Sequence, residues 1–269
     1  MKLFIKIWTV LFIFSALPIL IINLLNLQGV QDQSNGLKGK EVSPFISSVK
    51  KKNLSPHIQA EEHEDKVIYL TFDDGPNGNT REILSILQSK SAHATFFLIK
   101  GNIDKRPSLV KEIIKNGNAV GCHSVSHRVD VFYSSPAVAV KEMKQCQSAI
   151  YNSTRRHTPL IRVPFGSFPH LTPDIKQSLE QAGFIYWDWN IDSEDWTNDD
   201  ASQVYKNIVT QLEFVESKGY TPTVLLHDKE VTANMLPMLL DYLNKNGYKI
   251  KGITSDKKPV QFNRFLRPA

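Results

Sequence analysis

Two adjacent carboxylates and a pair of histidines give this chain the inventory of a hydrolytic metal site. Asp73 and Asp74 end an apolar run that begins at Val67, and His123 and His127 follow about fifty residues later. A catalytic zinc takes three protein ligands and keeps one position open for water. Because adjacent side chains leave the backbone in different directions, one carboxylate can be a ligand and the other a base. The set predicts metal-assisted hydrolysis.

Each part of this set has an ordinary structural explanation when it is taken alone. An Asp before Gly-Pro is a common way to end a strand, so the acidic pair before Gly75 can be a turn. Two histidines four positions apart face the same way on one helical turn, but unrelated pairs at this spacing are frequent. A magnesium phosphatase is disfavoured because no Gly-rich phosphate loop with a lysine accompanies the carboxylates. The combination of the two motifs therefore carries the prediction.

Three further polar groups suggest how such a site would move protons. Arg162 stands at the end of an apolar run, and a buried guanidinium there needs a carboxylate such as Asp73, in a catalytic or a purely structural ion pair. His227 also ends an apolar run and suits a general acid, although a lone histidine there is more often structural. Asp195 and Trp196 belong to an acidic, aromatic stretch. They form either a surface loop or an apolar wall beside a carboxylate that orients a histidine.

Short apolar runs alternate with amphipathic stretches from Lys66 onward. Strands are expected at 67–72, 94–99, 118–122, 160–163, 184–189, 223–227 and 248–253, and helices near 79–90, 107–116, 136–151, 172–182, 200–217 and 232–246. This alternation without a hairpin signal predicts a parallel α/β sheet, either closed into a barrel or open and doubly wound. The polar groups all follow strand ends, where the active sites of β/α barrels lie.

The N-terminal part of the chain differs from the rest. The apolar stretch from Ile7 to Leu27 has about the 20 residues needed to cross a bilayer. No small-residue cleavage site follows, which favours an uncleaved signal anchor over residues 1–27 rather than a cleaved signal peptide. Residues 28–64 are polar with few aromatics, which predicts a flexible linker. We therefore expect a single-pass protein of the cell membrane with an extracellular catalytic domain.

Composition excludes some functions. The 269 residues carry a net charge of +5, with no basic stripe interleaved with aromatics, so nucleic-acid binding is not expected. Hydrophobic residues make up 41% and charged residues 22%, as in an ordinary globular protein of one large domain. The two cysteines, Cys122 and Cys146, have no metal-binding spacing.

Five segments, in this order, resemble the motif series of the polysaccharide deacetylase family, also called the NodB-homology domain or carbohydrate esterase family 4. They are Thr71–Asp74, His123–His127, Arg162–Gly166, Asp192–Trp196 and Leu225–His227. The resemblance covers residues 65–255 and leaves 256–269 as a C-terminal tail. It implies a distorted (β/α)7 barrel, as a single catalytic domain after the N-terminal membrane segment.

The resemblance also implies a role for each residue. The metal ligands would be Asp74, His123 and His127, binding Zn²⁺ or another divalent transition metal such as Co²⁺. Asp73 would be the base, held by Arg162, while Asp195 would orient the acid His227. Trp196 and Leu225 would line the acetyl pocket. The backbone N–H of Phe165, where the family often has Tyr, would contact the oxyanion.

Family and expected location together predict the reaction. We expect a monomeric, metal-dependent hydrolase that removes N-linked acetyl groups from an N-acetylglucosamine polysaccharide, with peptidoglycan as first choice. A chitooligosaccharide deacetylase and a xylan O-acetyl esterase are alternatives within the fold. A noncatalytic module that binds cell-wall glycan is the alternative of another class. A complete set of acid, base and metal ligands argues against that module, because binding alone does not need it.

Overall fold

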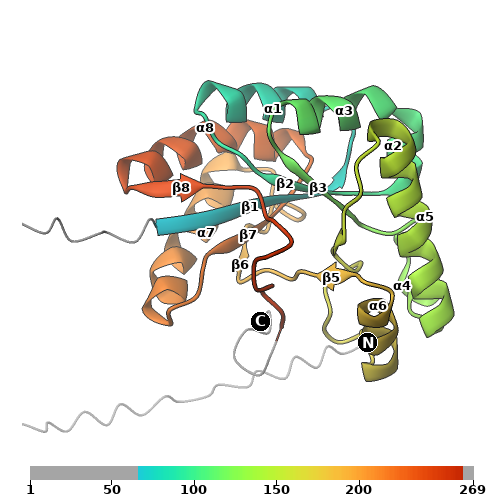
Figure 1. The fold of residues 1–269 in the computed structure, drawn as a ribbon. Helices are drawn as coiled ribbons and strands as arrows, with labels where there is room; N and C mark the ends of the chain where they lie inside the picture. Colours follow the sequence, from blue (N-terminus) through green and yellow to red (C-terminus); the bar gives the residue numbers. More distant parts are fainter. Residues whose placement is uncertain (1–65, 263–269) are drawn as a thin grey trace, which may run out of the picture. The chain divides into compact units, whose positions relative to one another are not determined.

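Strand β1 (Lys66–Gly75) is the centre of the sheet in the computed structural model, which describes residues 66–262. Its residues from Ile68 to Asp73 are buried, as expected for a strand covered on both faces. Along its edges it pairs with β7 (Thr223–His227) and β2 (Thr95–Leu98), and its first three residues pair with β8 (Tyr248–Ile250). Figure 1 shows β1 crossing the middle of the molecule.

All described strand pairings are parallel, and the sheet order is β5-β4-β3-β2-β1-β7-β6 with β8 added to β1. The remaining strands are β3 (Ala119–Cys122), β4 (Leu160–Ile161), β5 (Ile185–Tyr186) and β6 (Ile191–Asp192). Among these described strands, β5 and β6 stand at the two ends of the order and do not pair. The α/β parallel architecture is confirmed, but as a curled, incomplete barrel rather than a closed one.

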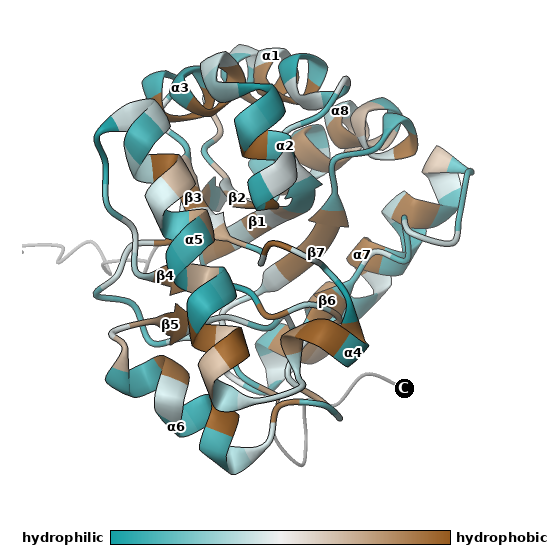
Figure 2. Cartoon of the chain, turned by 90° about the vertical axis from the view of Figure 1, so that its right-hand side faces the viewer, coloured by the Kyte–Doolittle hydropathy of each residue, from teal (hydrophilic) through white to brown (hydrophobic). Residues whose placement is uncertain are grey.

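Helices cover the outside of the curled sheet. They are α1 (Thr80–Ser89), α2 (Lys100–Lys105), α3 (Pro107–Lys115), α4 (Val129–Phe132), α5 (Pro136–Thr154), α6 (Pro173–Gln181), α7 (Ala201–Ser217) and α8 (Glu230–Lys245). Their inward faces are apolar and their outward faces polar, while the strands are mostly apolar (Figure 2). This segregation places the hydrophobic core between helices and sheet.

The gap between β5 and β6 differs from the expected single strand at 184–189. Successive backbone N–H groups of this segment turn to different partners: Trp187 N donates to Ile161 O, Asp188 N to Val260 O and Asn190 N to Thr223 O. A strand ladder needs one partner strand, so it breaks here. Helices α2 and α4 were also not expected, because four to six residues are too few to reveal a helical period.

The predicted C-terminal tail, 256–269, is described as far as Phe262. The Phe262 N–H donates to Asp188 Oδ2 at 2.8 Å, and its ring meets Trp189 edge-on at 4.8 Å between centroids. This segment therefore covers the break between β5 and β6. The predicted anchor (1–27) and linker (28–64) lie outside the described residues. Within 66–262, none of the helices combines the length and apolarity that a membrane span requires.

Candidate metal-dependent active site

The paired carboxylates reach the same cavity because β1 is irregular at its end. Adjacent residues of a regular strand point to opposite faces. The register between β1 and β2 shifts between Asp73 and Gly75, and Asp74 adopts the left-handed φ of 70°. A bulge of this kind re-aims the side chain that it carries. Both Asp73 and Asp74 consequently line one cavity of about 640 Å³ at the C-terminal ends of the strands.

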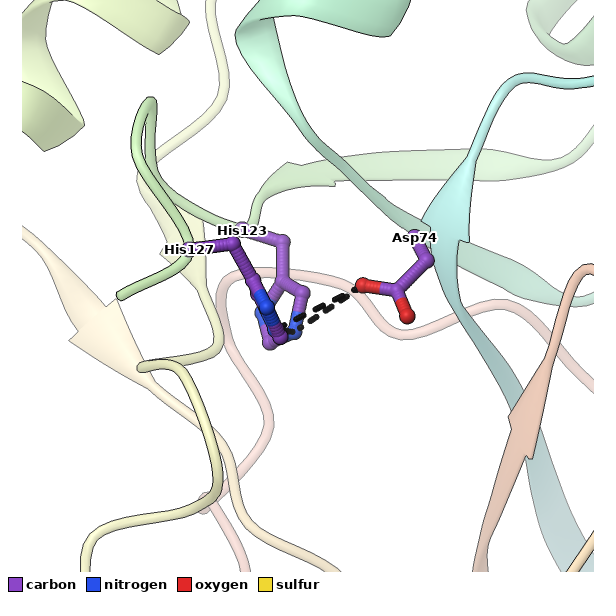
Figure 3. Close-up of side chains that lie close together, drawn as sticks. All are labelled: Asp74, His123 and His127. Carbon is purple, nitrogen blue, oxygen red and sulfur yellow. Dashed lines mark hydrogen bonds and ion pairs between the residues drawn. The ribbon is translucent and has the colours of Figure 1, made fainter. Parts of the chain in front are cut away.

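Three of the predicted ligands converge there. Figure 3 shows the imidazoles of His123 and His127 turned toward the carboxylate of Asp74. The two Nε2 atoms lie 3.1 Å apart, and Asp74 Oδ1 lies 3.7 Å from His123 Nε2 and 3.5 Å from His127 Nε2. A tetrahedral ion with bonds of about 2.0–2.1 Å holds its ligand atoms roughly 3.3–3.4 Å apart. The spacing of the three donor atoms fits such an ion.

The hydrogen bonding and protonation of the three donor groups also suit metal binding. Asp74 Oδ1 is buried and has no hydrogen-bond partner among the described residues, which is costly for a carboxylate unless a cation compensates it. His123 Nδ1 lies 2.7 Å from the carbonyl oxygen of Arg162, so Nδ1–H donates there and Nε2 keeps its lone pair for a metal. Burial, with the neighbouring His123, lowers the pKa of His127 and keeps that ring neutral. A neutral imidazole is the form that binds metals.

The histidine pair is brought together by a loop rather than by the helical turn that the spacing suggested. Residues 123–127 form no helix, and both Ser124 and His127 have left-handed φ angles, of 76° and 48°. The two rings still face one point, with their centroids 4.8 Å apart. A bent loop thus places the two imidazoles together as one turn of helix would.

Asp73 is a second, separately held carboxylate beside the ligands. It is buried, its Oδ2 lies 3.6 Å from His123 Nε2, and its Oδ1 accepts a hydrogen bond from Arg162 Nη1 at 3.0 Å. The fully buried Arg162 also donates to Thr71 Oγ1, Trp187 O and Asp188 O. Arg162 does not line the cavity; it lies behind Asp73 and ties it to the gap between β5 and β6.

Removing the guanidinium should cost substantial stability. We expect Arg162→Leu to lower the free energy of unfolding by about 3–5 kcal/mol, because it leaves Asp73 and two backbone carbonyls without their buried partner. Urea denaturation with a chelator present measures this. Arg81→Leu is the matched control: its exposed ion pair with Glu112, at 3.3 Å, should contribute less than about 1 kcal/mol. Equal losses in the two variants would contradict the structural role of Arg162.

His227 also lines the cavity, at the end of β7 and in register with Asp73. Its Nδ1 is 2.7 Å from Asp195 Oδ1, and its backbone N–H donates to Asp195 Oδ2 at 2.7 Å. Burial, the largest single influence, lowers the pKa of His227. The hydrogen bond and charge of Asp195, with the charges of Asp73 and Asp74, outweigh it and raise the pKa above its usual value. A raised pKa favours the protonated ring, which is the form that a general acid needs.

Asp195→Asn should shift the pH dependence of the reaction. Without the carboxylate the pKa of His227 falls, so the acid loses its proton at a lower pH. The alkaline limb of the kcat profile should therefore move to lower pH, with the greatest loss of rate above neutrality. Steady-state kinetics across pH measures the shift. Asp130→Asn, which changes an exposed carboxylate paired with Arg128, should leave the profile where it is, and an unmoved limb in Asp195→Asn would contradict the pairing.

The three predicted substrate contacts all lie on the cavity wall. Leu225 is buried, whereas Phe165 and Trp196 are 54% and 59% exposed. Large exposed aromatics rimmed by polar groups are typical of a ligand-binding groove. The Phe165 ring lies 4.8 Å from that of His127, and Phe165 has a left-handed φ of 61°.

Gly166 and Asp192, which belong to the motif segments, also line the cavity, and the structure adds Asn77, Trp189, Asp228 and Lys229. Of these, Asp228 directly follows His227 in the sequence, and this adjacency could have indicated that Asp228 belongs to the site. Its N–H donates to Asp73 O, its Oδ2 accepts from Thr80 Oγ1, and burial raises its pKa to about 6. Asp195, by contrast, was selected but does not line the cavity and acts from behind His227.

The fold and the three gathered donors are those of a metal-dependent hydrolase. Comparison with known proteins identifies the family: the chain belongs to the polysaccharide deacetylase family. The family profile described as "Polysaccharide deacetylase" matches residues 60–187. Together with the relatives described next, this match confirms the expectation raised by the motif series.

Individual relatives agree with this assignment. The chain is 36% identical to YheN of Bacillus subtilis, provisionally assigned as a polysaccharide deacetylase, over 93% of this chain and 94% of YheN. It is 36% identical to a peptidoglycan-N-acetylglucosamine deacetylase of Bacillus cereus over 74% of each chain. The crystal structure of the polysaccharide deacetylase Bc1974 from Bacillus cereus is similar with a TM-score of 0.68 and 35% identity, covering 73% of this chain and 97% of that one.

Proposed function

We propose that this protein is a zinc-dependent deacetylase that releases acetate from N-acetylglucosamine residues of peptidoglycan. The main observation behind this proposal is that Asp74, His123 and His127 converge on one point. A further carboxylate, Asp73, lies beside them, is held by Arg162 and is not needed as a ligand. Two imidazoles and one carboxylate suit zinc, and the Bacillus cereus relative with 36% identity is a peptidoglycan-N-acetylglucosamine deacetylase.

A divalent ion held by these three ligands supplies Lewis acidity: it lowers the pKa of water and polarises a carbonyl oxygen. Asp73 accepts the proton of the water that attacks the acetamide carbon. Arg162 holds Asp73 in place through its hydrogen bond. An amine cannot leave as its anion, so His227 delivers a proton to the departing nitrogen. Acetate and a free amino sugar are the products.

Cavity-wall groups would orient the sugar. The backbone N–H of Phe165 is proposed to donate to the oxyanion, a contribution of about 3–4 kcal/mol for such donors. Leu225 and Trp196 are proposed to enclose the acetyl methyl group, which explains why apolar side chains stand so close to charged ones.

Product analysis on defined glycans tests the proposal. Peptidoglycan fragments, chitooligosaccharides and acetylated xylan are offered to the full-length chain, with acetate and free amine measured in parallel. We expect both products from peptidoglycan fragments, and neither when a chelator is present. Acetate without amine from xylan would identify an O-acetyl esterase. A preference for chitooligosaccharides would change the substrate, and glycan binding without any acetate would favour a noncatalytic module.

Location forms part of the proposal. We propose that residues 1–27 anchor the protein in the cell membrane and that 28–64 tether the catalytic domain on the outer side, near the wall. Cell fractionation of the full-length chain and of a variant that lacks residues 1–27 tests this. The full-length protein should sediment with membranes and be digested by protease added to whole cells. Recovery of both forms in the cytosol would contradict it.

A further inference from the structure

We infer that Glu142, on helix α5, is a positioning residue of the metal centre: it holds residues 123–127, the ligand loop, in the shape that gathers the two imidazoles. The inference rests on the proposed metal-dependent function and adds to it a residue outside the motif series. Glu142 does not line the cavity, so it acts through the ligand loop and not on the substrate.

The backbone of the ligand loop needs external support. Ser124 and His127 both have left-handed φ angles, and neither is glycine. Such conformations are unfavourable for residues with a side chain and persist only where surrounding contacts over-determine them. The fully buried Ser124 meets part of this need, because its Oγ accepts the His127 N–H at 3.1 Å.

Glu142 satisfies the middle of the ligand loop with a single oxygen. Its Oε2 accepts the N–H of Val125, the N–H of Ser126 and the hydroxyl of Ser126, each at 3.0 Å. Glu142 is 7% exposed, so these bonds form away from bulk water. Buried N–H and O–H donors that lose their acceptor are costly, so a single side-chain oxygen at this reach keeps three groups of the ligand loop in place.

The two ligand histidines depend on Glu142 to different degrees. His123 directly follows β3, its N–H donates to Leu98 O, and its ring is held by Arg162 O. His127 comes after the central residues that Glu142 holds, and its side chain is 25% exposed against 3% for His123. Loss of Glu142 should therefore displace His127 more than His123, and should weaken metal binding without removing a ligand.

The test measures Zn²⁺ affinity of the full-length chain by competition with a chromophoric chelator. We expect Glu142→Ala to weaken binding about 10- to 100-fold, the usual effect of losing a residue that orients a ligand. Glu142→Gln retains an oxygen at the same reach and should stay close to wild type. Glu142→Asp keeps the charge but withdraws the oxygen by one methylene, and should be weaker than Glu142→Gln.

Met143→Ala is the matched control for stability. Met143 is the next residue of α5 and is fully buried in the core. Its truncation should lower Tm but leave the Zn²⁺ affinity unchanged. A second readout is the visible absorption of the Co²⁺-loaded protein, which reports ligand geometry: Glu142→Ala should change it and Met143→Ala should not.

The possible results distinguish failure of the role of Glu142 from failure of the proposed metal-dependent function. Wild-type affinity and an unchanged Co²⁺ spectrum in Glu142→Ala would overturn the role of Glu142 alone. If Glu142→Ala does not fold, the order of Glu142→Gln and Glu142→Asp decides. Asp binding as tightly as wild type while Gln does not would mean that charge alone matters, and would also overturn positioning. A wild-type chain that binds no Zn²⁺ would instead overturn the proposed function.

Discussion

Asp73→Asn is expected to abolish most turnover while the protein keeps its metal. The amide retains an oxygen that can accept the hydrogen bond from Arg162, so the side chain stays in place, but it cannot take a proton from water. General-base groups typically contribute about 10²- to 10⁴-fold to rate, and a loss in this range is expected for kcat. Acetate release gives the rate, and elemental analysis of the purified variant gives the metal content.

A control distinguishes loss of the base from a general change in charge. Asp104 is an exposed carboxylate paired with Lys100, and Asp104→Asn should keep the wild-type rate. Full activity in Asp73→Asn would refute the assigned base. Loss of metal in that variant would mean that Asp73 is a metal ligand. This is the alternative to test, because Asp73 Oδ2 lies only 3.6 Å from His123 Nε2.

His123→Ala is expected to give the opposite pattern, with the metal lost first and activity with it. The ring is almost fully buried and Arg162 O fixes its orientation, so the variant loses a nitrogen ligand that the fold holds in position. The loss of Zn²⁺ affinity should exceed the roughly 10- to 100-fold that follows removal of an orienting residue. Chelator competition measures the affinity.

His157→Ala serves as the control for removing an imidazole. His157 stacks on Tyr151, with ring centroids 4.3 Å apart, and does not line the catalytic cavity. That variant should bind Zn²⁺ as the wild type does. Wild-type affinity in His123→Ala would contradict the ligand assignment, whereas equal losses in both variants would point to unfolding.

The sequence by itself determined the class of fold and most of the chemistry. Apolar runs alternating with amphipathic stretches predicted parallel strands and helices, because periodicity is a local property that a chain displays residue by residue. The placement of Asp73, His123 and His227 after such runs predicted that they share one end of the sheet, since parallel strands bring their carboxyl ends together.

Tertiary structure decided how these groups face one another. A bulge turns Asp74 into the same cavity as Asp73, where the sequence suggested different directions. The His123–His127 segment is a loop held by Glu142, which lies 16 and 17 residues from its partners. Phe262 bonds to Asp188 across 74 residues and covers the break in the sheet. Such contacts join backbone groups to distant side chains, and no local period or spacing encodes them, so only the folded chain reveals them.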